Sequence, residues 1–264
     1  MAAKVVVKLG GGLITDKSSL KSPRTDIIDS ICNEISHLVS LGNSVIIVHG
    51  AGSYGHLLAK KWSLSHGLRK DFSEQQREAV KIVRSDMREL SSLVSKSLRD
   101  RGIETVTFPP SDWAKNTGDS FEGDVSIFDS FPTNVVPITF GDVVHVDGGA
   151  EFGILSGDDL MARISIEIPS VTHCVFLLGD AEGMMDKPPH LEGSKLIKLW
   201  KSGEIVETEH NSEQDVTGGI ELKAERASLI SKKVEEVWFI NGNCPERLSE
   251  LLTDGTTIGT KIVS

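Results

Sequence analysis

Residues 4–17 read KVVVKLGGGLITDK, and this segment predicts a phosphate-binding turn. A short apolar run, Val5–Val7, is followed by Lys8, by three consecutive glycines at Gly10–Gly12, and by a second lysine at Lys17. A buried strand that ends in glycines lets backbone N–H groups approach an anion without interference from a Cβ atom. The flanking lysines add positive charge. The P-loop pattern, GxxxxGK[ST] before a helix, is not met, so another fold is expected to hold the phosphate.

The size and charge of the chain limit its class. Its 264 residues suit one large domain or two closely packed lobes, and 39% hydrophobic with 25% charged residues is typical of a soluble globular protein. The net charge of −10 argues against nucleic acid or an anionic membrane surface as the main partner. A small anionic ligand is still compatible with this net charge, because a few lysines can dominate the electrostatic field of one cleft.

The sequence also carries little sign of export or of a membrane. No apolar run approaches the ~18 residues needed to span a bilayer. The first residues, MAAKVVVKLGGG, are too short in apolar length for a signal peptide and are expected to form a strand. The three cysteines, Cys32, Cys174 and Cys244, lie far apart without a CxxC motif. We expect free thiols in a reducing cytosol.

Apolar strands alternate with amphipathic helices along the whole chain. The predicted strands are 5–9, 44–48, 105–108, 135–140, 172–178, 237–240 and 259–263, with a hairpin at 143–154 that turns at 147–149. The predicted helices lie around 27–39, 80–98, 158–166, 222–233 and 245–252. This alternation predicts an α/β fold with a mostly parallel sheet between helices.

Glycine or acidic turns follow four of the predicted strands. They are Gly10–Gly12, Gly50–Gly52, Gly141–Asp142 and Gly179–Asp180. Ligands of such sheets bind beyond the carboxyl ends of the strands, so these turns should share one functional edge. The polar stretch Glu182–Asn211 is the best candidate for a mobile flap or an irregular insertion.

The second glycine turn, VHGAGSYGH, lies between two histidines. A helix beginning there would offer free N–H groups to an anion. His49 suits an ordinary packed residue at a strand end. His56 suits either a surface helix position or an anion contact.

Two later segments are further candidates. In DVTGGIELK, residues 215–223, Thr217 could cap a helix on which Lys223 reaches back toward a phosphate, although an ordinary loop with a solvated lysine explains it equally well. In SGDDL, residues 156–160, Asp158 and Asp159 open a helix, where acidic residues often serve only as partners of the helix dipole.

Competing chemistries lack support. GAGSYG places Ser53 as in a GxSxG nucleophile elbow, but no convincing acid–histidine pair follows it. The histidines show no zinc-binding spacing. GGGLITD fails the dinucleotide pattern GxGxxG at its last glycine.

Taken in order, the motifs KLGGG, HGAGSYGH, FGDVV, SGDDL, LGD and DVTGGIELK resemble the amino acid kinase superfamily. Within it they are most similar to the isopentenyl phosphate kinase family, and HGAGSYGH with its second histidine is the discriminating piece. The resemblance runs from Lys8 to Thr260. It departs from the family pattern at Gly12, where serine is common, at Tyr54, where phenylalanine is usual, and in LGDAEGMMD, which leaves the nucleotide details around 182–186 open.

The resemblance implies a three-layer αβα sandwich around an open, mainly parallel sheet. It implies a single amino-acid-kinase-fold domain over residues 1–264, in which residues 1–166 bind the phosphate acceptor and residues 167–264 bind ATP. The reaction would be transfer of the γ-phosphoryl group of ATP to isopentenyl phosphate. Two alternatives are a kinase of another small phosphate or phosphonate, such as a fosfomycin-type kinase, and a nucleotide-binding regulatory module without catalysis.

The resemblance also assigns roles to individual residues. The catalytic set is Lys8, Lys17, Asp158 and Lys223, with Lys17 stabilising the transition state and Asp158 orienting the lysines. The acceptor set is Ala51, Gly52, His56 and Gly157. The ATP-binding set is Lys8, Leu9, Gly10, Gly11, Gly12, Gly52, Asp180, Gly219 and Lys223.

The expected cofactors are ATP and Mg²⁺, with Mg²⁺ held largely by phosphate oxygens and water. A homodimer in the cytoplasm is implied by the resemblance alone. The prenyl tail needs an apolar pocket, for which Phe72, Ile82 and Val83 are candidates that serve equally well as ordinary core.

Overall fold

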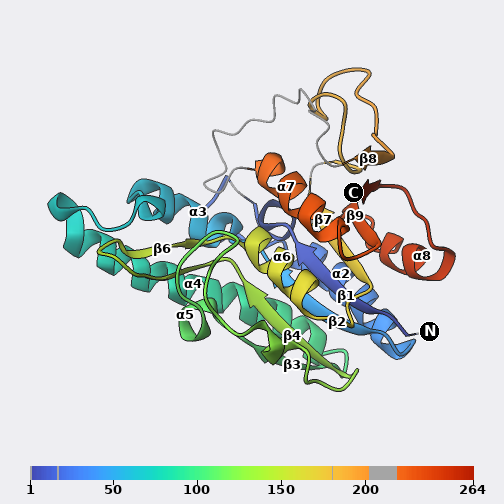
Figure 1. Ribbon diagram of the computed structural model, residues 1–264, viewed down its shortest axis with the longest axis horizontal. Helices are drawn as coiled ribbons and strands as arrows, with labels where there is room; N and C mark the ends of the chain where they lie inside the picture. Colours follow the sequence, from blue (N-terminus) through green and yellow to red (C-terminus); the bar gives the residue numbers. More distant parts are fainter. Residues whose placement is uncertain (1, 17, 180, 202–218) are drawn as a thin grey trace.

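A central sheet of eight strands runs through the computed structural model (Figure 1), which describes residues 2–16, 18–179, 181–201 and 219–264. The strand order is β3-β4-β2-β1-β7-β9-β10-β8. The strands are β1 Lys4–Leu9, β2 Ser44–His49, β3 Glu104–Thr107, β4 Val135–Phe140, β7 His173–Leu178, β8 Leu199–Lys201, β9 Glu236–Asn241 and β10 Thr260–Val263. Strand pairs are parallel except β9 with β10, so the predicted, mainly parallel sheet is confirmed.

One predicted hairpin lies apart from the main sheet, and one strand of the sheet was not predicted. β5 (Asp142–Val146) and β6 (Glu151–Leu155) form a separate antiparallel hairpin, as the sequence predicts. β8 (Leu199–Lys201) was not predicted, because it lies inside the stretch 182–211 that was expected to be irregular. It pairs with β10 at the edge of the sheet and buries Trp200. Residues 202–211 of that stretch lie outside the described residues.

Helices cover both faces of the sheet. They are α1 Gly11–Ile14, α2 Thr25–Ser40, α3 Gly52–Lys61, α4 Ser73–Arg99, α5 Pro110–Trp113, α6 Gly157–Glu167, α7 Gly219–Ser231 and α8 Arg247–Asp254, with 3₁₀ turns at η1 Leu64–His66, η2 Lys70–Phe72 and η3 Val125–Phe128. One apolar cluster joins the sheet to α2, α3, α4 and α8, and a second joins its other face to α6 and α7. The predicted three-layer αβα sandwich is therefore confirmed.

The alternation of side chains along β1 connects the sequence to these two layers. Val5, Val7 and Leu9 belong to the cluster with α2, whereas Val6 belongs to the cluster with α6. Successive side chains of a strand point to opposite faces. Lys8 therefore lies on the face that α6 covers, which brings a charged residue beside the first turn of that helix.

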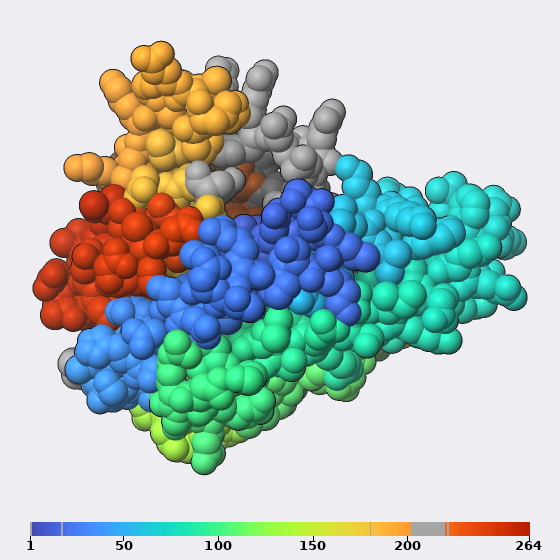
Figure 2. Space-filling model, turned by 180° about the vertical axis from the view of Figure 1, so that it is seen from behind, coloured from blue at the N-terminus to red at the C-terminus, as the bar shows by residue number. Residues whose placement is uncertain are grey.

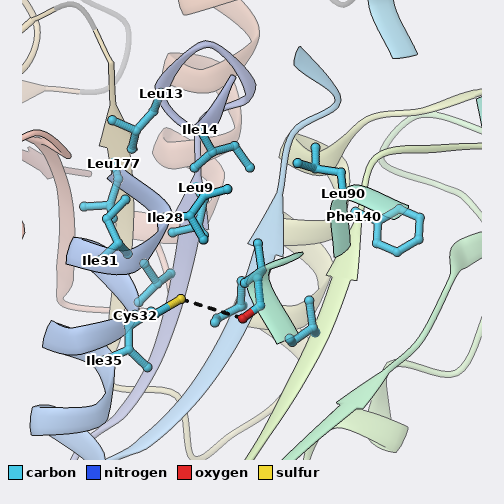
Figure 3. Packing of buried hydrophobic residues seen from close by; sticks show 14 of the residues in the cluster. Leu9, Leu13, Ile14, Ile28, Ile31, Cys32, Ile35, Leu90, Phe140 and Leu177 are labelled. Atoms are coloured by element: carbon cyan, nitrogen blue, oxygen red, sulfur yellow. Dashed lines mark hydrogen bonds between the residues drawn. The ribbon is translucent and has the colours of Figure 1, made fainter. Parts of the chain in front are cut away.

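The core on the α2 side is dense around the first glycine turn. Figure 3 shows Leu9 and Leu177 from neighbouring strands, Leu13 and Ile14 from α1, and Ile28 and Ile31 from α2 in one cluster, all at most 2% exposed. Burying an aliphatic side chain contributes about 1.5–3 kcal/mol. This packing anchors the short helix α1 to the sheet.

The region from η1 to the start of α4 projects from one end of the molecule in Figures 1 and 2. Three apolar side chains of α3, η2 and α4, Leu57, Phe72 and Ile82, are 40–45% exposed. Within the described part of the chain, no helix combines the length and apolarity that a bilayer crossing requires.

Candidate functional site

The four predicted turns lie side by side at the carboxyl edge of the sheet. Their strands are neighbours in the order β4-β2-β1-β7. Backbone hydrogen bonds connect them: the Gly50 amide donates to the Leu9 carbonyl (2.9 Å), the Gly10 amide to Leu177 (3.2 Å), and the Gly141 amide to His49 (3.1 Å). These turns therefore share one edge of the sheet, as the sequence predicts.

The first two glycine turns touch through their backbones. A Cβ atom on Gly11 would lie 2.4 Å from the Gly52 amide nitrogen, and one on Gly50 would lie 2.6 Å from the Gly11 nitrogen. Gly52 also has a φ of +48°, which few other residues adopt. These glycines are therefore required for close approach between two chain segments as well as for turn geometry.

α1 and α3 begin at these turns, so the amides of Gly11 and Gly12 open one helix and the amide of Gly52 opens another, whereas the Ser53 amide already donates to Thr15 Oγ1. First-turn amides of a helix lack acceptors within the helix and carry partial positive charge. Gly10 differs, because its amide is already bonded to Leu177. The edge thus presents free backbone N–H donors from the turn after β1 and from the turn after β2. On the turn after β1, these donors begin with the Gly11 amide.

Lys8 forms a buried ion pair with Asp158 at the start of α6. The two residues are 4% and 2% exposed, and Lys8 Nζ contacts Asp158 Oδ1. Ser156 caps this helix by accepting the Asp158 amide hydrogen at 3.1 Å. Gly157 fits between them, since a Cβ atom there would lie 3.4 Å from Lys8 Cε. Lys8 is therefore fixed in place, whereas a surface lysine would be mobile.

Lys223 approaches the same carboxylate from α7. Its Nζ lies 3.8 Å from Asp158 Oδ2, and the side chain is 17% exposed. Asp158 thus lies between two ammonium groups from opposite ends of the sequence, which limits their mutual repulsion. Gly219 is the first residue of α7. Lys17 and Asp180, together with Thr217 and Gly218 of the motif before α7, lie outside the described residues.

A second buried ion pair fastens α7 to α6. The Arg226 Nε donates to Asp159 Oδ1 at 2.7 Å, and the two residues are 7% and 4% exposed. Burial raises the pKa of the Asp159 carboxyl, an effect that the hydrogen bond from Arg226 opposes. Arg226 was not among the predicted site residues, although its position three residues after Lys223 places both on one helix face. One helix turn thus presents Lys223 to Asp158 and Arg226 to Asp159.

Replacing Arg226 with alanine is expected to lower the free energy of unfolding by about 3 kcal/mol, because it leaves the Asp159 carboxylate buried without its partner. Urea denaturation followed by circular dichroism measures this change. Arg77→Ala is the matched control. Arg77 also forms a two-point ion pair, with Glu151 at 2.8 and 2.9 Å, but both side chains are well exposed. We expect a change of at most about 1 kcal/mol there. Equal losses in the two variants would contradict the role assigned to Arg226.

The two histidines of the second turn differ in environment. His49 is fully buried against Phe140, with ring centroids 4.9 Å apart, and burial lowers its pKa to about 4. Its Nδ1 lies 3.1 Å from the Gly50 carbonyl oxygen, which assigns the proton to that nitrogen. His49 is therefore a neutral packing residue near pH 7. His56 is half-buried on α3, one helical turn after Gly52.

The remaining predicted contacts would be made by the backbone. The Leu9 side chain is 0% exposed within the core, so only its main chain faces the edge. Ala51 precedes α3, and its amide nitrogen would lie 3.2 Å from a Cβ on Gly11. Gly179 packs on the first glycine turn, where a Cβ atom would lie 3.0 Å from the Gly12 carbonyl oxygen.

The edge as a whole gathers buried or half-buried cations, helix-opening amides and a carboxylate that orients the cations. Such a set neutralises negative oxygen atoms in fixed positions. Phosphoryl transfer depends mainly on this combination of positioning and electrostatic stabilisation. The geometry therefore suits a site that binds phosphate groups over the turns of β1 and β2.

Comparisons with known proteins agree with this geometry. Residues 3–241 match the model of the amino acid kinase family. The isopentenyl phosphate kinase of Thermoplasma acidophilum is 31% identical over 259 residues, which cover 98% of this chain and 99% of the relative. A solved product complex of the T. acidophilum isopentenyl phosphate kinase aligns with a TM-score of 0.79 at 28% identity, covering 98% of this chain and all of that one. Another isopentenyl phosphate kinase structure, 24% identical, supports the fold with a TM-score of 0.84 over 98% of this chain and all of that one.

Proposed function

Because the chain belongs to the amino acid kinase family, we propose that it transfers the γ-phosphoryl group of ATP to isopentenyl phosphate, giving isopentenyl diphosphate and ADP. The observation that carries this proposal is the similarity to a curated isopentenyl phosphate kinase along nearly the whole of both chains. The enzyme is thus a phosphotransferase whose acceptor is itself a phosphate group.

The buried cations have direct roles in this proposal. Lys8 and the amides of Gly11 and Gly12 would contact the transferring phosphates, and Lys223 with Gly219 would hold the phosphates of ATP. Asp158 would hold the ammonium groups of both lysines in position, and its contacts with them support this role. Lys17 would stabilise the transition state, and Asp180 would contact the nucleotide. Residues 1–166 would form the acceptor lobe and residues 167–264 the ATP lobe.

His56, Ala51, Gly52 and Gly157 would bind the acceptor. A phosphate monoester has a second pKa of about 6, so the attacking oxygen is largely ionised at neutral pH and no general base is required. His56 would therefore donate a hydrogen bond to the acceptor phosphate without taking a proton from it.

An isopentenyl tail needs apolar surface close to that phosphate. α3 packs on α4 at Gly55, where a Cβ atom would lie 3.4 Å from Met87 Sδ and 3.8 Å from Val83 Cγ1. Both α4 residues are at most 3% exposed. We propose that the hydrocarbon tail of the acceptor lies on this side of α3, next to the core layer that Gly55, Val83 and Met87 form.

The donor set of the site fits Mg²⁺ that arrives with ATP. The chain supplies ammonium groups and amides, which bind phosphate oxygens, and the buried Asp158 is occupied by lysines. We propose that Mg²⁺ is held by phosphate oxygens and water and shields their charge. In the described residues, no three His, Cys, Asp or Glu side chains are grouped as a metal site.

Two further properties complete the proposal. Cys32, Cys174 and Cys244 are free thiols, which supports a reducing, cytoplasmic location. A homodimer is proposed from the resemblance to the family, and light scattering on the purified protein measures it.

An acceptor panel tests the proposed reaction. The purified protein receives ATP and Mg²⁺ with isopentenyl phosphate, dimethylallyl phosphate, fosfomycin, UMP or acetylglutamate, and ADP release is measured. We expect the highest kcat/KM with isopentenyl phosphate.

His56→Ala should lower the kcat/KM for isopentenyl phosphate by about 10- to 100-fold, since a hydrogen bond to a charged group contributes about 1.5–3 kcal/mol.

His66→Ala is the matched control, because His66 is an exposed histidine on the adjacent η1 turn. It should keep the wild-type kinetics. Preference for fosfomycin, UMP or acetylglutamate would overturn the proposed acceptor. Wild-type kinetics in His56→Ala would overturn only the assignment of the acceptor site.

A further inference from the structure

The Thr15 hydroxyl lies in the contact between the two glycine turns. It donates to the Gly11 carbonyl oxygen at 2.8 Å and accepts the Ser53 amide hydrogen at 2.9 Å. Thr15 is 1% exposed. A hydroxyl group donates and accepts at the same time, which neither a methyl nor an ammonium group can do. One side-chain atom thus joins the turn after β1 to the helix after β2.

The Thr15 hydroxyl leaves no room for a side chain on Gly52. A Cβ atom on Gly52 would lie 2.0 Å from Thr15 Oγ1 and 2.5 Å from the Gly11 carbonyl oxygen. Gly10–Gly12, Gly50 and Gly52 have no side chains and Ala51 has only a methyl group, so these turn residues offer no polar side chain to join the two backbones. The Thr15 hydroxyl therefore supplies a specific polar link at the point where the two backbones are closest.

This link acts on α3 as a capping group from another part of the chain. Ser53 is the second residue of α3, so its amide has no acceptor within the helix. The residue before the helix, Ala51, makes no side-chain cap bond. Thr15 provides the acceptor instead. Because His56 follows Ser53 on the same helix by three residues, the hydroxyl also sets where His56 lies relative to Gly11.

We propose that Thr15 is a positioning residue that fixes the acceptor-binding helix α3 against the donor-phosphate turn at Gly11. The inference rests on the proposed phosphoryl transfer and deepens it. In-line transfer requires the attacking oxygen and the γ-phosphorus at near-contact distance, and small misplacements slow such reactions strongly. Because Thr15 is 1% exposed, we expect it to contact neither substrate, so its loss should affect the step in which both must be aligned.

Thr15→Val and Thr15→Ser test the proposal as a matched pair. Valine keeps the β-branched shape and removes the hydroxyl, whereas serine keeps the hydroxyl. Thr15→Val should lower kcat by about 10- to 100-fold, as expected for a misplacement near 1 Å. Calorimetric dissociation constants for isopentenyl phosphate alone and for ADP alone should change by less than about threefold, because Thr15 contacts neither ligand in this scheme. Thr15→Ser should stay within about threefold of the wild-type kcat.

Stability is measured alongside activity, because the valine variant leaves the Ser53 amide without its acceptor. Assays run well below the melting temperature of each variant, and kcat is expressed per folded molecule. If Thr15→Val does not fold, Thr15→Cys replaces it as a variant with a weaker donor and acceptor, and an intermediate kcat is expected. A wild-type kcat in the folded valine or cysteine variant would overturn the proposal, as would a loss fully explained by the unfolded fraction.

Amide hydrogen exchange at Ser53 separates this proposal from the choice of acceptor. Exchange should accelerate in Thr15→Val and stay at the wild-type rate in Thr15→Ser, whichever substrate the enzyme uses. If the wild-type enzyme does not turn over isopentenyl phosphate in the acceptor panel, the kcat values of the Thr15 variants are compared using the acceptor that it does turn over. Failure of the proposed function then appears in the wild-type enzyme, and failure of the positioning role appears only in the difference between the valine and serine variants.

Discussion

Lys8→Met should lower the turnover of isopentenyl phosphate by about 10³-fold, which is the upper range for removing one group that stabilises transition-state charge. Lys8 is 4% exposed and is held by Asp158, so its ammonium group is preorganised before the phosphates arrive. Steady-state kcat from ADP release measures the loss. The same change removes the lysine in closest contact with the buried Asp158 carboxylate, and the free energy of unfolding should fall by about 3–5 kcal/mol.

A double variant separates the two effects. In Lys8→Met/Asp158→Asn the buried carboxylate is removed together with its cation, so most of the lost stability should return while turnover stays low. Lys4→Met is the matched single control. Lys4 lies at the opposite end of the same strand, where it pairs with the exposed Asp129, and its kcat should equal that of the wild type. Recovery of turnover in the double variant would show that Lys8 serves the fold alone.

Gly11→Ala should lower turnover by at least about 10²-fold, because displacing a positioned group by about 1 Å can reduce the rate to that extent. The added Cβ would lie 2.4 Å from the Gly52 amide nitrogen and 2.9 Å from its Cα, so the two turns must move apart. Backbone atoms cannot rotate away as a flexible side chain can. Overpacking of this kind also destabilises the fold by about 1–3 kcal/mol. Kinetics and thermal unfolding together measure the two effects.

Gly255→Asn is the control for replacing a glycine. Gly255 ends α8 with a φ of +71°, and a Cβ atom there would meet nothing within 4 Å. Asparagine tolerates this left-handed conformation, so turnover and stability should stay close to those of the wild type. Wild-type turnover in Gly11→Ala would show that the close approach of the two turns is irrelevant to the reaction.

The regular elements of the fold were predictable because their signals are local. Buried parallel strands are short apolar runs, and the long helices show apolar residues every three or four positions. The predicted strands and the helices around 27–39, 80–98 and 158–166 are all present. The short elements were not predictable in this way. α1 is a four-residue helix built on glycines, and β8 is a three-residue strand defined by its pairing with β10.

The candidate site, too, was predictable from the sequence in part only. The glycine turns, the lysines and the acidic pair Asp158–Asp159 stand out in the sequence, because each follows a strand or opens a helix. The alternation along β1 places Lys8 on one face, but the sequence does not say which helix covers that face. That depends on the strand order, in which β1 lies between β2 and β7.

The sequence by itself therefore determined the class of fold and the edge of the sheet at which the glycine turns gather, and it predicted phosphate chemistry for the residues there. The tertiary structure shows the contacts of Lys8 and Lys223 with Asp158, which the family resemblance implied. Only the tertiary structure decided that Arg226 meets Asp159 and that the Thr15 hydroxyl meets the Ser53 amide. The physical reason is that these partners come from different strands and helices. Their meeting depends on sheet order and on the contact of two glycine backbones, and neither leaves a periodic signal along the chain.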